Sequence, residues 1–248
     1  MIRMNDVHKA FGDNRVLRGL TLEIPKGSSM VIIGGSGTGK SVALKCVLGL
    51  IHPDSGKILV DGKDAASGDR DAFLARFGML FQGGALFDSL PVWQNVAFRL
   101  LRGSLKRPVD EARAIAIDKL RRVGLKSAVA DLFPAELSGG MQKRVGLARA
   151  IAADPEIIFF DEPTTGLDPI MSGVINDLIR EIVVEMGATA MTITHDMTSV
   201  RAIADNVAML HDGVIKWTGP VAEMDASGDP YLDQFIHGRA EGPIEAVR

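Results

Sequence analysis

Residues 34–41 have the sequence Gly34-Gly35-Ser36-Gly37-Thr38-Gly39-Lys40-Ser41, which fits the phosphate-binding template G-x-x-x-x-G-K-[S/T] at every fixed position. Glycine lets consecutive backbone N–H groups curl around an anion without a Cβ clash, and a following helix would point its positive dipole end at the same place. We therefore expect Lys40 to reach the β and γ phosphates of a nucleoside triphosphate, and the Ser41 hydroxyl to ligate Mg²⁺.

The sequence on either side of this loop supports that interpretation. An apolar run at residues 30–33 precedes the loop, and an apolar segment at residues 42–48 follows it. This is the order of strand, loop and helix that the template requires. The alternative, a glycine-rich turn with a chance lysine, does not explain both flanks.

Length and composition narrow the class of protein. A chain of 248 residues is long enough for one sizeable domain or for a core with a smaller subdomain. The formal net charge of −3 gives no basic field, which disfavours direct binding of nucleic acid. The single cysteine, Cys46, lies in an apolar segment, so we expect a small core residue and no disulfide or zinc site.

Membrane-spanning segments are not predicted. No uninterrupted apolar run approaches the roughly 18 to 20 residues needed to cross a bilayer, and the N-terminus shows no signal pattern. We expect a cytosolic protein whose contact with a membrane depends on a partner.

The remaining chain predicts an α/β fold. Alternating apolar positions predict antiparallel strands at residues 2–11 and 16–24, and Asp212-Gly213 predicts the turn of a hairpin over residues 207–217. Shorter strands are expected at residues 58–60 and 77–81, with a loop and a short helix between them. Helical spacing over residues 91–123 is interrupted at Pro108, which predicts at least two helices there.

Two further strands end in polar residues. The apolar run at residues 157–160 ends in Asp161 and Glu162, and the run at 189–194 ends in His195. Beside a phosphate loop, Asp161 would hold Mg²⁺ through its water shell, and Glu162 would polarise the water that attacks the γ phosphate. His195 would hydrogen-bond that phosphate or the attacking water, since it lacks partners at metal-ligand spacing. The alternatives are a solvated strand end for the two acids and a structural role for the histidine.

Residues 137–145, Leu-Ser-Gly-Gly-Met-Gln-Lys-Arg-Val, are not explained by phosphate-loop chemistry alone. They resemble the signature of ATP-binding cassette (ABC) ATPases. The phosphate loop, Gln82, the Asp161-Glu162 strand end, Gly166-Leu167-Asp168 and His195 complete that family's motif order. The resemblance implies a P-loop, RecA-like ATPase core at residues 1–82 and 151–226 with an N-terminal antiparallel β subdomain. It also implies an inserted helical subdomain at 83–150 and a C-terminal tail at 227–248.

The resemblance also implies the roles of the site residues and a homodimer. Ser138, Gly139, Gly140 and Met141 would bind the γ phosphate of an ATP held by the loop of a second subunit, and ATP would join the closed dimer. Met141 departs from the Gln that many members have. The other implied roles are adenine contact by Phe11 and Val16, Mg²⁺ contact and partner sensing by Gln82, contact across the dimer by Asp168, and γ-phosphate switching by His195.

Residues 81–90, the Leu-Ser-Gly-Gly-Met form of the signature and Gln234-Phe235-Ile236-His237-Gly238 resemble the ATPase subunits of MCE-type phospholipid transporters, the Mla and Mkl group. The implied partners are a multispanning permease, an MCE-domain protein and, in some systems, a small STAS-domain protein. The implied location is the cytoplasmic face of the inner membrane. The residues that would line the permease groove are Leu86, Phe87, Val92 and Trp93, with core packing as the alternative for each.

Other couplings remain open at this stage. An importer of a small solute would share every nucleotide motif and differ around residues 83–98 and in the tail. A soluble ABC ATPase acting on nucleic acid or ribosomes, and a nucleotide-binding module without turnover, are further alternatives. The tail from Ser227 to Arg248 is expected to dock against the other subunit or an accessory protein. Transport direction, lipid headgroup, turnover rate and the permease's identity do not follow from the sequence.

Overall fold

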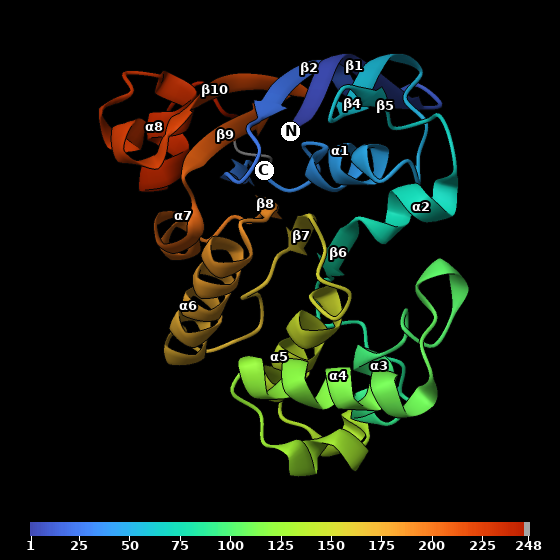
Figure 1. Ribbon diagram of the computed structural model, residues 1–248. Helices are drawn as coiled ribbons and strands as arrows, with labels where there is room; N and C mark the ends of the chain where they lie inside the picture. Colours follow the sequence, from blue (N-terminus) through green and yellow to red (C-terminus); the bar gives the residue numbers. More distant parts are fainter. Residues whose placement is uncertain (246–248) are drawn as a thin grey trace. The chain divides into compact units, whose positions relative to one another are not determined.

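The structure, a computed structural model, describes residues 1–245, and the chain forms two compact units (Figure 1). The first unit comprises residues 1–67 and the described residues from Met191 onward, and the second comprises Gly68–Ala190. Both units contain helices and strands, so the α/β class is confirmed.

The first unit contains an antiparallel sheet with the strand order β2-β1-β4-β5. It is built from β1 (Ile2–Phe11), β2 (Asn14–Ile24), β4 (Ser55–Val60) and β5 (Lys63–Asp64). In the first part of β1, the apolar side chains of Ile2, Met4 and Val7 are fully buried, as the apolar pattern predicts for a strand with one core face. The predicted N-terminal antiparallel sheet is therefore confirmed.

The same unit contains the strand that leads into the phosphate loop. This strand is β3 (Ser29–Ile33), which pairs in parallel with β9 (Asn206–His211), and β9 pairs antiparallel with β10 (Val214–Pro220). All five residues of β3 are buried, which explains its uninterrupted apolar sequence. Asp212 and Gly213 both have positive φ, 50° and 73°, as the predicted hairpin turn requires.

Three helices and a further strand complete the first unit. Helix α1 (Lys40–Val47) follows the loop, and β8 (Thr189–Ile193) carries the chain out of the second unit into α7 (Met197–Ile203). The third is α8 (Pro230–His237), which follows a short 3₁₀ segment at Val221–Ala226. Cys46 in α1 is buried, and burial raises the pKa of its thiol to about 11, so its prediction as a core residue is confirmed.

The second unit pairs two strands in parallel and packs helices around them. The strands are β6 (Phe77–Leu80) and β7 (Ile157–Asp161), whose Phe77 and Phe159 rings stack at 5.4 Å between centroids. The helices are α2 (Arg70–Ala75), α3 (Val92–Val96), α4 (Val109–Arg122), α5 (Gly139–Ala150) and α6 (Pro169–Met186). Short 3₁₀ segments lie at Gly103–Leu105, Ser127–Asp131 and Pro134–Glu136.

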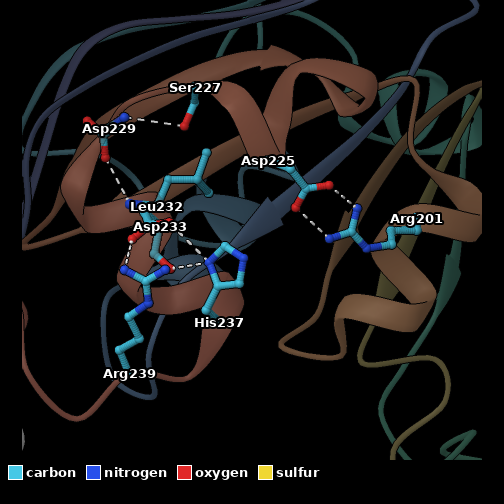
Figure 2. Close-up of polar contacts among 8 residues, drawn as sticks. All are labelled: Arg201, Asp225, Ser227, Asp229, Leu232, Asp233, His237 and Arg239. Atoms are coloured by element: carbon cyan, nitrogen blue, oxygen red, sulfur yellow. Dashed lines mark hydrogen bonds and ion pairs between the residues drawn. The ribbon is translucent and has the colours of Figure 1, made fainter.

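Helix α8 was not foreseen in the sequence, although its boundary signals are present. Asp229 caps the helix by accepting a hydrogen bond from the Leu232 N–H at 2.8 Å, Pro230 is its first residue, and Gly238 ends it with φ 61°. Figure 2 shows Asp233 on α8 close to both His237 and Arg239. These exposed ion pairs add little stability, so the caps and the buried Leu232 define the helix.

Residues after α8 fold back onto it. The buried amide of Gln234 donates to the carbonyls of Arg239 and Ile244 and accepts from the Ile244 N–H at 2.7 Å. Nearby, Figure 2 shows Arg201 on α7 paired through two hydrogen bonds with Asp225, which precedes the helix. The tail also packs on the rest of its unit, because the Tyr231 ring lies 5.2 Å from the His211 ring between centroids. Residues 246–248 lie outside the described residues.

One close approach in the second unit depends on glycine. A Cβ added to Gly78 on β6 would stand 2.1 Å from the Ala150 carbonyl oxygen at the end of α5. We predict that Gly78→Ala lowers the free energy of unfolding by about 2–3 kcal/mol, because the helix must move away from the strand. The midpoint of urea unfolding, compared at an unchanged denaturant slope, measures the effect.

Gly173 in α6 provides the matched control. A Cβ there would meet nothing within 4 Å, so Gly173→Ala should raise stability by about 0.5–1 kcal/mol through helix propensity. Equal stability of the two alanine variants would contradict the packing argument.

Candidate nucleotide-binding and hydrolysis site

The phosphate loop follows β3 in a conformation that its glycines permit. Gly34, Gly37 and Gly39 have φ values of 150°, 77° and 103°. At Gly34 the constraint is also steric, because a Cβ would stand 2.2 Å from the Leu210 carbonyl oxygen on β9. The loop therefore lies directly against the neighbouring strand, which fixes where its N–H groups point.

The lysine of the loop lies across it. Lys40 Nζ donates to the carbonyl oxygens of Gly34 and Gly35 at 2.7 and 2.8 Å, and the Thr38 hydroxyl donates to the Gly35 carbonyl at 2.9 Å. Helix α1 begins at Lys40 after Gly39, which has no side chain to cap it, and Ser41 is exposed in its first turn. An ammonium group, a hydroxyl and a helix N-terminus thus converge, which suits a phosphate anion with a magnesium ion.

A cleft of about 830 Å³ opens beside this loop within the first unit. Its walls include Val16 from β2, the loop residues 35–38 and the hairpin turn at residues 211–213. Tyr231 and residues 243–245 form the side contributed by the C-terminal segment. Sequence reasoning did not foresee these C-terminal residues, because the fold-back that places them depends on the side chain of Gln234.

The two residues expected at adenine differ in their positions. Val16 lines the cleft and packs beside the loop, because a Cβ on Gly39 would stand 3.0 Å from Val16 Cγ1. Phe11 is half exposed at the end of β1, with Lys9 Nζ 5.5 Å from its ring centroid. Phe11 is not among the described residues that line the cleft, so only Val16 adjoins the loop directly.

His195 lies two residues beyond the end of β8 in the first unit and is exposed. The preceding residue, Thr194, donates its N–H to the Ile32 carbonyl on β3 at 3.3 Å. Asp196 caps α7 by accepting from the Thr198 N–H and the Ser199 hydroxyl. His195 is therefore anchored next to the strand that leads into the loop.

In the second unit, β7 ends at Asp161, and Glu162 follows it in a left-handed conformation with φ 48°. Non-glycine residues rarely adopt this conformation, and it marks functional sites more often than chance. The Thr165 hydroxyl donates to Glu162 Oε2 at 3.1 Å. Both acids are half-buried, so the strand end is only partly solvated.

The signature segment begins helix α5. Ser138 is the N-cap, and its hydroxyl oxygen accepts from the Met141 N–H at 3.3 Å. Gly140 lies close to α6, because a Cβ there would stand 2.7 Å from Met171 Cε. Asp168 caps α6 in the same manner, accepting from the N–H groups of Ile170 and Met171.

Gln82 is exposed in the loop that follows β6. Beyond it the backbone turns through Gly84 and Ala85, both with positive φ. Arg149 on α5 donates to the carbonyl oxygens of these two residues at 2.7 and 2.8 Å. The loop that carries Gln82 is therefore attached to the helix that begins with the signature.

The residues expected at a permease interface do not share one environment. Phe87 is 42% exposed and stacks on Phe98 at 4.4 Å between centroids, while Leu86 and Trp93 are half-buried. Val92 is fully buried, so the prediction that it lines a groove is wrong for this residue, and the core alternative holds. The apolar spacing around Val92 is the same whether the residues face a partner or the core, and in α3 Val92 faces the core.

Oxygen donors suitable for Mg²⁺ stand in both units: the Ser41 hydroxyl in the first, and the Gln82 amide and Asp161 carboxylate in the second. Among residues 1–245, no group of three or more His, Cys, Asp or Glu side chains could hold a metal without further ligands. Within the same residues, no helix is long and apolar enough to cross a membrane.

Comparison with protein families adds to this geometry. The family model described as ABC transporter matches residues 17–165. The chain is 42% identical, over 98% of its length and 70% of the relative's, to the probable ribonucleotide transport ATP-binding protein mkl of Mycobacterium leprae. It is 40% identical, over 98% of its length and 91% of the relative's, to the intermembrane phospholipid transport system ATP-binding protein MlaF of Escherichia coli K12.

Solved structures agree with the fold. The dimeric bacterial ABC transporter cassette MJ0796 superposes with a TM-score of 0.80 at 31% identity, covering 89% of this chain and 99% of that one. The cbiO1 subunit of a Clostridium perfringens ABC transporter complex superposes with a TM-score of 0.81 at 30% identity, covering 96% and 94%.

The loop geometry predicts an order among its glycine variants. Gly34→Ala should weaken ATP binding more than 100-fold, because its Cβ would collide with a backbone carbonyl that cannot yield cheaply. Gly37→Ala meets nothing within 4 Å and should cost only the left-handed strain, about tenfold in affinity. Titration with a fluorescent ATP analogue measures both, and an equal loss would contradict the steric explanation.

Proposed function

This chain belongs to the ABC transporter family as an ATPase that binds ATP with Mg²⁺ and couples its hydrolysis to transport, and we propose that the cargo is phospholipid moved between membranes. The observation that carries the proposal is its similarity to the E. coli phospholipid transport ATP-binding protein over nearly the whole of both chains. The Phe81–Leu90 segment and the signature form, on which the sequence resemblance was based, support the same assignment.

A second cargo class is favoured by a specific finding. The mycobacterial mkl proteins are similar to this chain to the same degree, and their names give ribonucleotide transport as the probable activity. A transporter of a small solute would use the same nucleotide chemistry. The two proposals differ in the permease, so only a membrane partner or a bound cargo separates them.

For binding, we assign the ATP phosphates to the residue 34–41 loop. Lys40 would exchange its two carbonyl contacts for phosphate oxygens, at the place where the α1 N-terminus adds positive potential. Val16 would contact adenine from the cleft wall and Phe11 would stack on it from the end of β1. Both apolar contacts would exclude water from one side of the nucleotide.

For hydrolysis, we assign the base to Glu162, whose carboxylate would accept a proton from the attacking water. Ser41, Gln82 and Asp161 would hold Mg²⁺, which neutralises charge on the phosphates when bound. His195 would donate a hydrogen bond to the γ phosphate or hold the water. The support is that Glu162 and His195 each follow a buried strand at its carboxyl end, where ligands of parallel sheets bind.

For coupling, we propose a homodimer in which two copies pair head to tail. Ser138, Gly139, Gly140 and Met141 at the N-terminus of α5 would receive the γ phosphate bound to the partner, and Asp168 would contact the partner. The helical residues 83–150 would serve as one functional subdomain beside the nucleotide core at 1–82 and 151–226. Hydrolysis would remove the shared anion, and the dimer would open.

The remaining partners that we propose are a multispanning permease, an MCE-domain protein and, as in some systems, a small STAS-domain protein. These partners would place the chain at the cytoplasmic face of the inner membrane. Phe87 would be the centre of the permease contact, because it is exposed while Phe98 supports its ring. The tail from residue 227 would contact the other subunit or an accessory protein.

The base assignment makes a direct prediction. Glu162→Gln should lower kcat for ATP hydrolysis by about 100-fold or more while ATP still binds, because the amide cannot accept the proton. Light scattering with ATP and Mg²⁺ should then show a persistent dimer. Glu181→Gln, an exposed carboxylate on α6, is the matched control and should hydrolyse ATP at the wild-type rate. Wild-type turnover in the Glu162 variant would refute the assignment.

The cargo proposal predicts the composition of the native complex. A tagged chain, recovered from detergent-solubilised native membranes, should bring with it a multispanning permease, an MCE-domain protein and phospholipid, identified by mass spectrometry. Phe87→Ala should reduce permease recovery, whereas Phe133→Ala, another exposed aromatic in the second unit, should not. Recovery of a permease together with a soluble-ligand binding protein would instead support the small-solute alternative.

A further inference from the structure

Lys143 is a buried charge that none of the assigned roles uses. It lies on α5, 4% exposed, five residues beyond the signature serine. Its Nζ donates to the main-chain carbonyl oxygen of Glu162 at 3.3 Å. An ammonium group taken out of water is costly unless polar groups receive it, so such a residue is retained where it performs a task.

The charges that act on Lys143 are the carboxylates of Asp161 and Glu162 at the end of β7. Burial lowers the pKa of its ammonium, while the carboxylates of Glu162 and Asp161 act on the pKa in the opposite direction. Lys119, the other buried lysine described, differs because its Nζ forms an ion pair with the carboxylate of Asp154 at 2.5 Å. Lys143 therefore brings a positive charge close to the carboxylates of Asp161 and Glu162, and it also donates a hydrogen bond to the backbone carbonyl of Glu162.

Glu162 needs such support. Its φ of 48° lies in the left-handed region, which a side chain with a Cβ keeps only where its surroundings fix it. The Thr165 N–H donates to the Glu162 carbonyl at 3.3 Å, and the Thr165 hydroxyl donates to its carboxylate at 3.1 Å. The residue is therefore held at two points from its own loop and at one point from helix α5.

We propose that Lys143 is a positioning residue for the hydrolytic base: it fixes the backbone of Glu162 to helix α5 and thereby sets the direction of the Glu162 carboxylate. Because α5 begins at the signature, the contact also connects the segment assigned to the partner's phosphate with the base in the same subunit. The inference rests on the proposed role of Glu162.

The first test is the steady-state ATPase activity of the full-length purified chain. Lys143→Met keeps an unbranched side chain of similar length and removes the charge and the donor. We expect kcat to fall at least tenfold, with KM for ATP and the affinity for a fluorescent ATP analogue within about threefold of wild type. Lys143→Arg, which keeps a donor, should recover part of the loss. Lys126→Met, an exposed lysine in the same unit, is the matched control and should retain kcat.

The second test separates action through Glu162 from a general structural effect. In a Glu162→Gln background, adding Lys143→Met should lower the residual rate less than twofold, because the group being positioned is already absent. An equal factor in both backgrounds, or an unchanged kcat in the single Lys143 variant, would overturn the inference while leaving the base assignment intact. Wild-type turnover by Glu162→Gln alone would instead remove the base assignment and this inference with it.

If Lys143→Met fails to fold, a variant at an exposed position can still test the proposal. Thr165 is exposed, and Thr165→Val removes the hydroxyl that holds the same carboxylate. We expect Thr165→Val to lower kcat with little change in KM, and Thr165→Ser to restore it. Wild-type kcat in Thr165→Val would contradict the premise of the proposal, which is that catalysis depends on the contacts that fix the direction of the Glu162 carboxylate.

Discussion

The nucleotide site of the first unit depends on close contacts between backbone segments that only glycine, which lacks a Cβ, can make. The Gly34 Cα lies so close to β9 that a Cβ would stand 2.2 Å from the Leu210 carbonyl. At Gly213 a Cβ would stand 2.5 Å from the Val16 carbonyl, and the Arg18 N–H donates to the Gly213 carbonyl at 2.9 Å. The loop, the hairpin turn and β2 are therefore held against one another, and the cleft is the space that they leave.

Buried apolar strands fix the positions of the polar residues that follow them. All five residues of β3 and the first four of β7 are buried, and each strand ends where polar groups begin. A fully buried strand cannot slide along its neighbours without exposing apolar surface, so the position of its last residue is fixed. The loop lysine and the acidic strand end owe their precision to this hydrophobic packing, since the polar contacts alone are individually weak.

In the second unit, helix α5 connects the segments that carry the proposed site residues. Its N-terminus carries the signature, Lys143 contacts the backbone of Glu162, and Arg149 contacts the loop after Gln82. Burial lowers the pKa of Arg149, as it does for Lys143, so both cations carry a desolvation cost that their carbonyl contacts offset. A movement of this helix would be transmitted to the base and to the Gln82 loop together.

Several parts of the structure were predictable because their signals are local. Glycine positions predict the phosphate loop and the Asp212-Gly213 hairpin. Uninterrupted apolar runs predict the strands that lead to Asp161 and His195. Helix α8 carries equally local caps, Asp229 and Gly238, although the sequence analysis assigned no element there. The burial of Val92 was not decidable from spacing, because an inward and an outward helical stripe have the same period.

The sequence by itself determined the family, the nucleotide chemistry and where most of the strands lie along the chain, since these depend on residue types at fixed spacing. Only the tertiary structure decided that residues 243–245 form part of the cleft wall and that Lys143 contacts Glu162. Each depends on a side chain that donates to a distant backbone carbonyl: Gln234 to that of Ile244, 10 residues away, and Lys143 to that of Glu162, 19 residues away. Such contacts are specified by three-dimensional packing, which no local periodicity records.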